Sequence, residues 1–263
     1  MPWTISHIAA VLPLHRCGTR RLSFAALTLG ACSPDFGYYI GQFKWADWAH
    51  TPWGLVLFCL PSSLALLGLL QLFQHELASL LPSPTLRAAL HAHRPHSLRS
   101  AHSVARLSVA IVLGAATHMV WDGFTHHSAW PVQHSSWLQM PFSIAGHKLY
   151  LYNILQHAST LIGALILWLA YRRWAASSAA QALALSPPHS HQANRHPIYT
   201  LAALALAALL LGWVLGLFFA ADDTSGGYPF KASVVNFVLH SSAAFMGLLL
   251  AVLLFKKYCR PNA

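Results

Sequence analysis

Long apolar stretches alternate with short polar loops along this chain, and the pattern predicts six membrane-spanning helices. The predicted spans cover residues 22–41, 51–73, 104–125, 150–171, 199–220 and 233–255. Each span reaches the roughly 20 residues that an α-helix needs to cross a bilayer. The first twelve residues are also apolar but end at Pro13 and a basic turn. We therefore expect a short N-terminal helix that lies in or dips into the bilayer without crossing it.

Composition supports the same class, an all-α polytopic membrane protein that forms a single transmembrane domain over residues 1–263. Hydrophobic residues make up 56% of the chain and charged residues only 8%, far below the ~25% charged residues of soluble domains. The net charge of +10 is typical of basic loops that flank membrane spans. No folded basic surface is evident, so we expect no nucleic-acid partner. The four cysteines lack a paired spacing, so no essential disulfide is expected.

Lysine and arginine sort by loop, and this distribution predicts the orientation of the chain. The basic loops precede the first span, join spans two and three, join spans four and five, and follow the last span. The positive-inside rule therefore predicts that both termini are cytoplasmic. Two of these inner loops, 82–102 and 175–197, are low in complexity and rich in histidine. They are interpreted as flexible cytoplasmic loops, with a metal-storage tract as the alternative.

The most informative polar pattern lies in the third predicted span, where His118, Asp122 and His126 are each four residues apart. Steps of four place the three side chains on one slowly rotating stripe of an α-helix. An ionised carboxylate at mid-bilayer costs about 2.5–3.5 kcal/mol, and a nearby divalent cation held by imidazoles would offset that cost. The alternative interpretation is a polar helix face that forms hydrogen bonds with other helices.

Other polar side chains share the depth of this stripe when each is placed at about 1.5 Å per residue. They are Asp35, His50, His157 and His240, from four further spans or span mouths. Each also has a structural interpretation. Asp35 suits an N-cap after Pro34, and His50 suits an interfacial position at a helix start. His157 and His240 each follow an asparagine by four residues, which fits an interhelical hydrogen-bond ladder equally well.

Distance limits how the stripe binds metal. His118 and His126 would lie about 12 Å apart along the helix axis, too far to share one ion at bond lengths of about 2.1 Å. Either His118 and Asp122 hold one ion while His126 serves a second, or His126 lies outside the ligand set. A carboxylate that bridges two metals is a common hydrolytic device, and we assign that role to Asp122.

An ordered set of short motifs resembles a known family. The motifs are Met1-Pro2-x-Thr4-x-Ser6-His7, Ser33-Pro34-Asp35, His50-Thr51, Thr117-His118-x-x-Trp121-Asp122-x-x-Thr125-His126 and Leu155-Gln156-His157. Together they resemble a bacterial integral membrane family known only as a domain of unknown function (domain-of-unknown-function family 4184). That family is distantly similar to inner-membrane metal-dependent hydrolases. The resemblance implies a bacterial cytoplasmic membrane location and metal ligation by His7, Asp35, His50, His118, Asp122 and His126. His7 reaches an outer-half site only if the first segment dips into the bilayer.

Three functions fit these residues. The first is a metal-dependent hydrolase that uses zinc or a similar divalent ion to cleave a lipid-linked ester or phosphoester. Asp122 or Asp35 would then handle the proton, and Lys148 at the outer edge would contact an anionic head group. The second is a transporter or ion-conducting protein that uses the same intramembrane His and Asp residues. The third is a structural membrane protein with a polar core.

Overall fold

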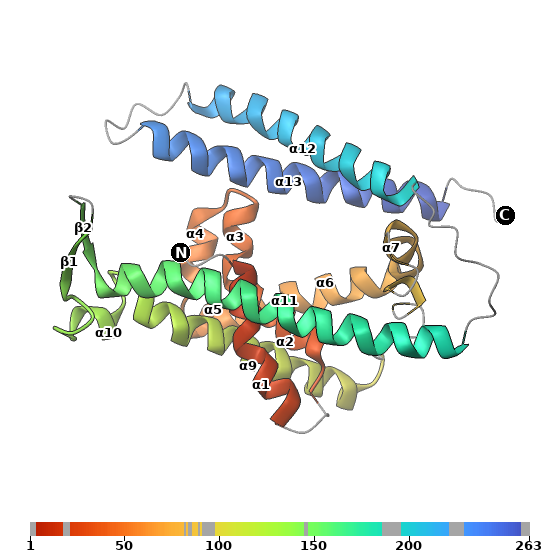
Figure 1. Ribbon diagram of the computed structural model, residues 1–263, viewed down its shortest axis with the longest axis horizontal. Coiled ribbons are helices and arrows are strands. Elements are labelled where there is room, and N and C mark those ends of the chain that lie inside the picture. Colours follow the sequence, from red (N-terminus) through yellow and green to blue (C-terminus); the bar gives the residue numbers. More distant parts are fainter. Residues whose placement is uncertain are drawn as a thin grey trace. The chain divides into compact units, whose positions relative to one another are not determined.

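A computed structural model describes residues 4–17, 22–81, 83, 86–88, 90, 98–144, 147–185, 196–220 and 229–258. The protein is almost entirely helical, as predicted, with one short β-hairpin formed by β1 (Pro141–Ile144) and β2 (His147–Tyr150). The chain divides into two compact units. Because the placement of the units relative to each other is not defined, each is described by itself (Figure 1).

The first unit comprises residues 1–36, 46–68 and 96–174. Its elements are η1 (Thr4–His7), α1 (Ile8–Cys17), α2 (Phe24–Cys32), η2 (Ser33–Asp35), α5 (Pro52–Gly54), η3 (Leu55–Cys59), most of α6 (Leu60–Leu72), α9 (Ala101–Thr125), α10 (Trp130–Gln133), the hairpin, and most of α11 (Leu151–Leu185). The short helix α4 (Phe43–Ala49) ends inside this unit. A buried apolar cluster from α1, α2, α6 and α9 forms its core.

Two glycines allow α2 and α9 to pack backbone against backbone. A Cβ atom at Gly114 of α9 would lie 2.9 Å from the main-chain nitrogen of Ala31 and closer still to the carbonyl oxygen of Leu27. A Cβ atom at Gly30 of α2 would likewise lie too close to the carbonyl oxygen of Ile111. Small residues at helix crossings permit this approach in membrane proteins. The crossing brings the end of α2 against the turn of α9 that carries His118.

Prolines shape two of the helices that lead to the site. Pro34 has no N–H group, so it interrupts the helical ladder, and α2 changes there to the 3₁₀ turn η2 before α3 (Phe36–Tyr39). Pro61 lies just inside α6, and the preceding residues Leu55–Cys59 form a π-helical turn. Such a turn relieves the clash between a proline ring and the carbonyl four residues before it.

The second unit comprises residues 37–45, 69–95 and 175–263. Its main elements are α7 (Gln74–Leu80), α12 (His196–Ala220) and α13 (Pro229–Tyr258), and α12 and α13 lie side by side (Figure 1). Phe73, Leu80 and Leu253 form a buried apolar cluster. At its edge Lys256 donates a hydrogen bond to the Ser79 hydroxyl, with an Nζ–Oγ distance of 2.8 Å.

Within the described residues, four helices are long and apolar enough to cross a membrane: Pro52–Leu72, Ala101–Gln133, Leu151–Ser177 and His240–Tyr258. They match four of the six predicted spans and indicate a membrane protein. The count of six is not confirmed, because the first predicted span is divided at η2 and the described apolar part of α12 covers only Tyr199–Val214.

Parts of both predicted inner loops lie outside the described residues. Helix α11 continues to Leu185 and so covers the start of the 175–197 segment, and α9 begins at Ala101, inside the 82–102 segment. Ser100 caps α9 by accepting a hydrogen bond from the main-chain N–H of Ser103.

Candidate metal centre

The last turns of α9 carry the two residues at the middle of the site. His118 is completely buried and Asp122 is 6% exposed, and both belong to the predicted stripe. The shortest contact between a histidine and a carboxylate of the site joins His118 Nε2 to Asp122 Oδ2 at 3.2 Å. On its other side, His118 Nδ1 lies 2.7 Å from the carbonyl oxygen of Ala31. A carbonyl only accepts, so Nδ1 carries a ring proton and donates it to Ala31, while Nε2 faces the carboxylate.

The break in α2 supplies both this carbonyl and the second carboxylate. Because Pro34 has no N–H, the carbonyl of Gly30 accepts instead from the Ser33 hydroxyl at 2.8 Å, while the next carbonyl, that of Ala31, accepts from His118. The 3₁₀ turn then directs Asp35, which is only 2% exposed, toward α9. Asp35 Oδ1 lies 3.6 Å from His118 Nε2, and Oδ2 accepts a hydrogen bond from the Thr4 hydroxyl at 2.5 Å.

His50 follows the short helix α4. With Asp35, His118 and Asp122 it makes a group of four potential metal ligands. Its Nδ1 donates to the carbonyl of Ala46 at 2.7 Å, and the same carbonyl accepts from the main-chain N–H of His50 at 3.2 Å. Its Nε2 lies 3.6 Å from Asp35 Oδ1 and 3.6 Å from Asp122 Oδ2. Burial alone would lower the pKa of His50, but the Asp122 carboxylate, the Ala46 carbonyl and the Asp35 carboxylate raise this pKa above its ordinary value. The cluster therefore favours positive charge at this position.

The structure also brings His7 into the cluster, although it comes from the N-terminal segment. His7 is 3% exposed, and its Nε2 lies 3.5 Å from Asp122 Oδ1. Its ring stacks on that of His118, with centroids 3.8 Å apart and an angle of 17° between the planes. The turn η1 is held against α11, because the Ser6 hydroxyl donates to the carbonyl of Thr160 at 3.1 Å.

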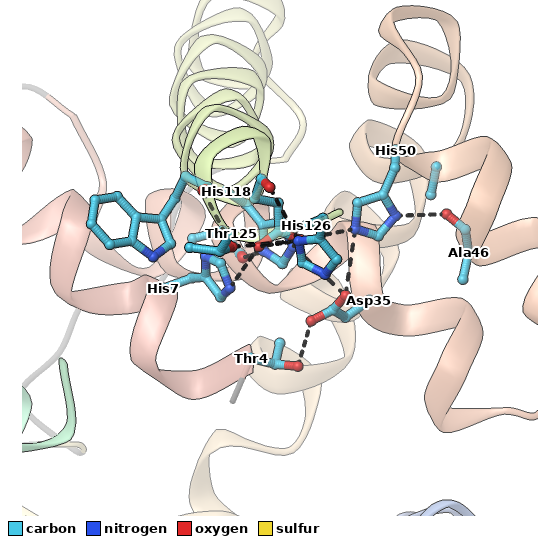
Figure 2. Close-up of polar contacts among 12 residues, drawn as sticks. Thr4, His7, Asp35, Ala46, His50, His118, Thr125 and His126 are labelled. Atoms are coloured by element: carbon cyan, nitrogen blue, oxygen red, sulfur yellow. Dashed lines mark hydrogen bonds and ion pairs between the residues drawn. The ribbon is translucent and has the colours of Figure 1, made fainter. Parts of the chain in front are cut away.

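Figure 2 shows that the donor atoms of these residues converge on one small volume. Two three-residue groups, His7–His118–Asp122 and Asp35–His50–His118, each have ligand atoms within 4.8 Å of one another. These buried His and Asp groups are able to hold a metal ion.

We define the four-donor cage as His50 Nε2, His118 Nε2, Asp35 Oδ1 and Asp122 Oδ2, because its histidine–carboxylate separations are those expected between ligands of a divalent ion. The four histidine–carboxylate separations are 3.2 Å once and 3.6 Å three times. Bonds of about 2.0–2.2 Å in tetrahedral geometry place neighbouring ligand atoms about 3.3–3.6 Å apart. Imidazole and carboxylate are also the donor types that zinc and similar ions take.

Several buried polar atoms of the cluster have no hydrogen-bond partner among the described residues. They are His118 Nε2, Asp35 Oδ1, Asp122 Oδ1 and both ring nitrogens of His7. Buried polar atoms are normally satisfied, and a charged group without a counterpart is costly to bury. A bound cation among these atoms would remove that cost.

His126 lies at the edge of the cluster, outside the helical stripe that was expected to carry it. Helix α9 ends at Thr125, and His126 is the C-cap residue with an extended backbone conformation. Its Nδ1 is 3.1 Å from the main-chain carbonyl of Asp122 and 3.6 Å from Asp122 Oδ1. The same nitrogen therefore faces both a carbonyl, to which it donates, and the carboxylate.

The remaining predicted site residues are not members of the two groups of potential metal ligands in the described part of the chain. His157 is on α11 with an exposed side chain, outside both groups of potential metal ligands in the described part of the chain. Lys148 is exposed on β2, with Nζ 5.6 Å from the centre of the Tyr150 ring. His240 is on α13, in the second unit.

Thr4 is the site residue that the sequence reasoning did not assign. Its hydroxyl bonds to Asp35 across 31 positions of sequence. The available signal was its place three residues before His7, which puts both on the single turn η1. The carbonyls of Ala31 and Ala46 carry no side-chain signal at all.

Taken together, the apolar helices and the buried cluster define a helical membrane protein with a candidate His/Asp metal centre. The chain belongs to the family described as "Domain of unknown function (DUF4184)", which matches residues 1–255. No curated protein and no solved structure matches the chain.

Proposed function

We propose that this protein is a membrane-embedded, metal-dependent hydrolase that holds a divalent ion, zinc or one of similar preference, in the four-donor cage. The observation that carries the proposal is the set of histidine–carboxylate separations, 3.2–3.6 Å, in a site with two buried carboxylates. A dication neutralises both carboxylates, so the loaded cage has no net charge to bury. Main-chain carbonyls orient His50 and His118 in the way that outer-shell groups orient metal-bound histidines.

When bound, the ion would act as a Lewis acid that polarises an ester oxygen and makes water more acidic. His7 is our candidate for the proton acceptor, because its Nε2 borders the cage and has no hydrogen-bond partner in the described part of the chain. In the hydrolysis, the water oxygen bonds to phosphorus or to a carbonyl carbon, and the bond to the leaving oxygen breaks. The proton that His7 removes from water ends on the leaving oxygen, so no further reactant is needed. Asp35 and Asp122 serve as ligands and fix the cage.

The substrate class follows from the location of the site. His118 and Asp122 of the cage are on α9, which has the length and hydropathy of a membrane span, so a lipid-linked ester or phosphoester reaches the cage from within the bilayer. The distribution of lysine and arginine supports a bacterial cytoplasmic membrane protein with both termini inside. Lys148, exposed on β2, is our candidate for a contact with an anionic head group.

The first test is metal content in detergent-purified protein that carries a non-histidine tag and lacks the inner-loop histidines. We expect about one tightly held ion per chain in wild type and a near-complete loss in Asp122→Asn, which keeps the shape but removes the charge. The matched control is His157→Ala, which deletes an exposed histidine outside the cage. Equal, negligible metal in wild type and Asp122→Asn would refute the metal centre.

A second comparison separates a catalytic ion from a structural one, because a cage with four protein ligands is also typical of structural zinc. His7→Gln leaves all four cage donors in place. We expect it to retain the ion but to lose about 100-fold or more in hydrolysis of lipid phosphoesters, the typical contribution of a general base. Retained metal with no hydrolysis by wild type would overturn the hydrolase proposal. Metal flux across proteoliposomes without hydrolysis would favour a transporter.

A further inference from the structure

A cavity of about 270 Å³ lies beside the metal centre and shares His7 with it. Its walls come from η1 and α1, from Trp121 of α9, and from one face of α11. The lining is almost wholly apolar, and small side chains on both helices leave the space open. The lining includes His7, Trp121, Leu155, Ala158, Ile162 and Ile166.

The α11 residues of this lining follow helical spacing. Leu155, Ala158, Ile162 and Ile166 lie three or four positions apart, so they form one continuous stripe. Between Leu155 and Ile166 the helix rises about 16 Å. The hydrocarbon core of a bilayer is about 30 Å thick, so the stripe has the length of one leaflet. An acyl chain of a membrane lipid is the ligand that fills one leaflet along such a stripe.

We propose that this cavity binds one acyl chain of a glycerophospholipid substrate and thereby holds its ester next to His7. The inference rests on the proposed function and specifies its substrate. Since α9 and α11 both have the length and hydropathy of membrane spans, the acyl chain of the lipid enters the cavity sideways from the bilayer without leaving an apolar environment. The cavity adjoins the centre at His7, whose ring stacks on His118 while the residue also lines the cavity.

Ser6 and Gly163 hold the two walls of the cavity together. A Cβ atom at Gly163 would lie 2.8 Å from Ser6 Cβ and 2.9 Å from the Ser6 carbonyl oxygen, closer than side chains normally approach. The Ser6 hydroxyl also donates to the carbonyl of Thr160. The N-terminal turn is therefore fixed to α11, and this contact positions His7 between the cavity and the cage.

The test is photo-crosslinking of the full chain in vesicles of phosphatidylethanolamine and phosphatidylglycerol. The probe is a trace of phosphatidylglycerol with a diazirine in one acyl chain. We expect saturable labelling of the peptide 155–166, competed by unlabelled phosphatidylglycerol. Ala158→Trp and Ile162→Trp each fill the cavity and should reduce this labelling about tenfold, the loss expected when one or two methylene groups are displaced. The control Leu161→Trp adds the same bulk on the same helix outside the lining.

The outcomes separate this inference from the proposed function, because metal content and lipid hydrolysis are measured on the same samples. Saturable labelling that both cavity variants abolish, without lipid hydrolysis, would support the cavity and refute the hydrolase. Labelling of 155–166 that neither cavity variant reduces, in protein that retains its metal, would overturn the cavity proposal. Competition by an isoprenoid lipid but not by an acyl lipid would also overturn it.

Discussion

Gly114→Ala should weaken metal binding at the proposed centre although it changes no ligand. A Cβ atom at this position would lie 2.9 Å from the Ala31 nitrogen, whereas ordinary contact begins at 3.4 Å, and the Leu27 carbonyl is closer still. Helix α2 must therefore move away from α9 by at least 0.5 Å. Asp35 and the carbonyl of Ala31 belong to the α2 side of this crossing, while His118 and Asp122 belong to α9.

A movement of this size is large on the scale of metal coordination. The 2.7 Å bond from His118 to Ala31 would reach about 3.2 Å, the upper limit of an N–H···O hydrogen bond. The 3.6 Å separation between His118 Nε2 and Asp35 Oδ1 would exceed 4 Å, whereas metal–ligand distances tolerate only about ±0.2 Å. We expect metal affinity to fall at least 10–100-fold, as it does when an outer-shell partner of a ligand is lost.

The assay is metal titration of detergent-purified apo protein, with thermal unfolding as a check on folding. Gly68→Ala is the matched control, because it also lies in an apolar helix but its Cβ atom would meet only Leu98 Cδ1, at 3.5 Å. We expect this control to bind metal like wild type. If folded Gly114→Ala also binds metal with wild-type affinity, the backbone contact between α2 and α9 does not set the geometry of the cage.

Three further predictions address the surroundings of the cage. Thr4→Val removes the hydroxyl that bonds to Asp35 Oδ2 and should weaken metal binding about 10–100-fold, as measured by competition with a chelating dye; unchanged affinity would contradict a role for this bond. His126→Ala should retain the ion, because His126 Nδ1 donates to a main-chain carbonyl, whereas His118→Ala should lose it; equal metal contents would contradict this assignment. Removing the ion with a chelator should lower the free energy of unfolding by about 2.7 kcal/mol relative to protein in free metal at about 100 times Kd, measured in lipid by thermal denaturation, and Asp122→Asn should show no such shift.

Sequence spacing was sufficient to predict the part of the site that lies on one helix. His118 and Asp122 are one turn apart on α9, and the helical period alone places them on the same face. Depth along a span was also informative, because it grouped Asp35 and His50 with them. The direction in which a side chain points could not be predicted, since depth does not fix the rotation of a helix about its axis. His157 has the predicted depth on α11, but its side chain is exposed.

The remaining parts of the site depend on tertiary packing that no local pattern encodes. His7 reaches Asp122 because η1 is fixed to α11 at Ser6 and Gly163, a contact between segments far apart in sequence. His126 was expected to continue the helical stripe, but α9 ends one residue earlier and His126 turns back as its C-cap. The main-chain carbonyls that orient His50 and His118 lie in α4 and in the last turn of α2, and these positions were not predicted residue by residue.

The two orienting carbonyls also bear on whether the cage holds a proton or a metal. Nδ1 of His50 and of His118 donates to a carbonyl. In a neutral ring Nε2 then presents a lone pair to the carboxylate oxygens, an arrangement that repels unless a cation lies between them. A proton on Nε2 would draw the nitrogen and oxygen to about 2.7–2.9 Å, the length of a charge-assisted hydrogen bond. The observed separations of 3.2–3.6 Å are longer and agree with four of the six edges of a tetrahedron around a metal ion. They therefore support the proposed metal site, and we expect proteoliposomes that contain this protein to show no proton flux under an imposed pH gradient.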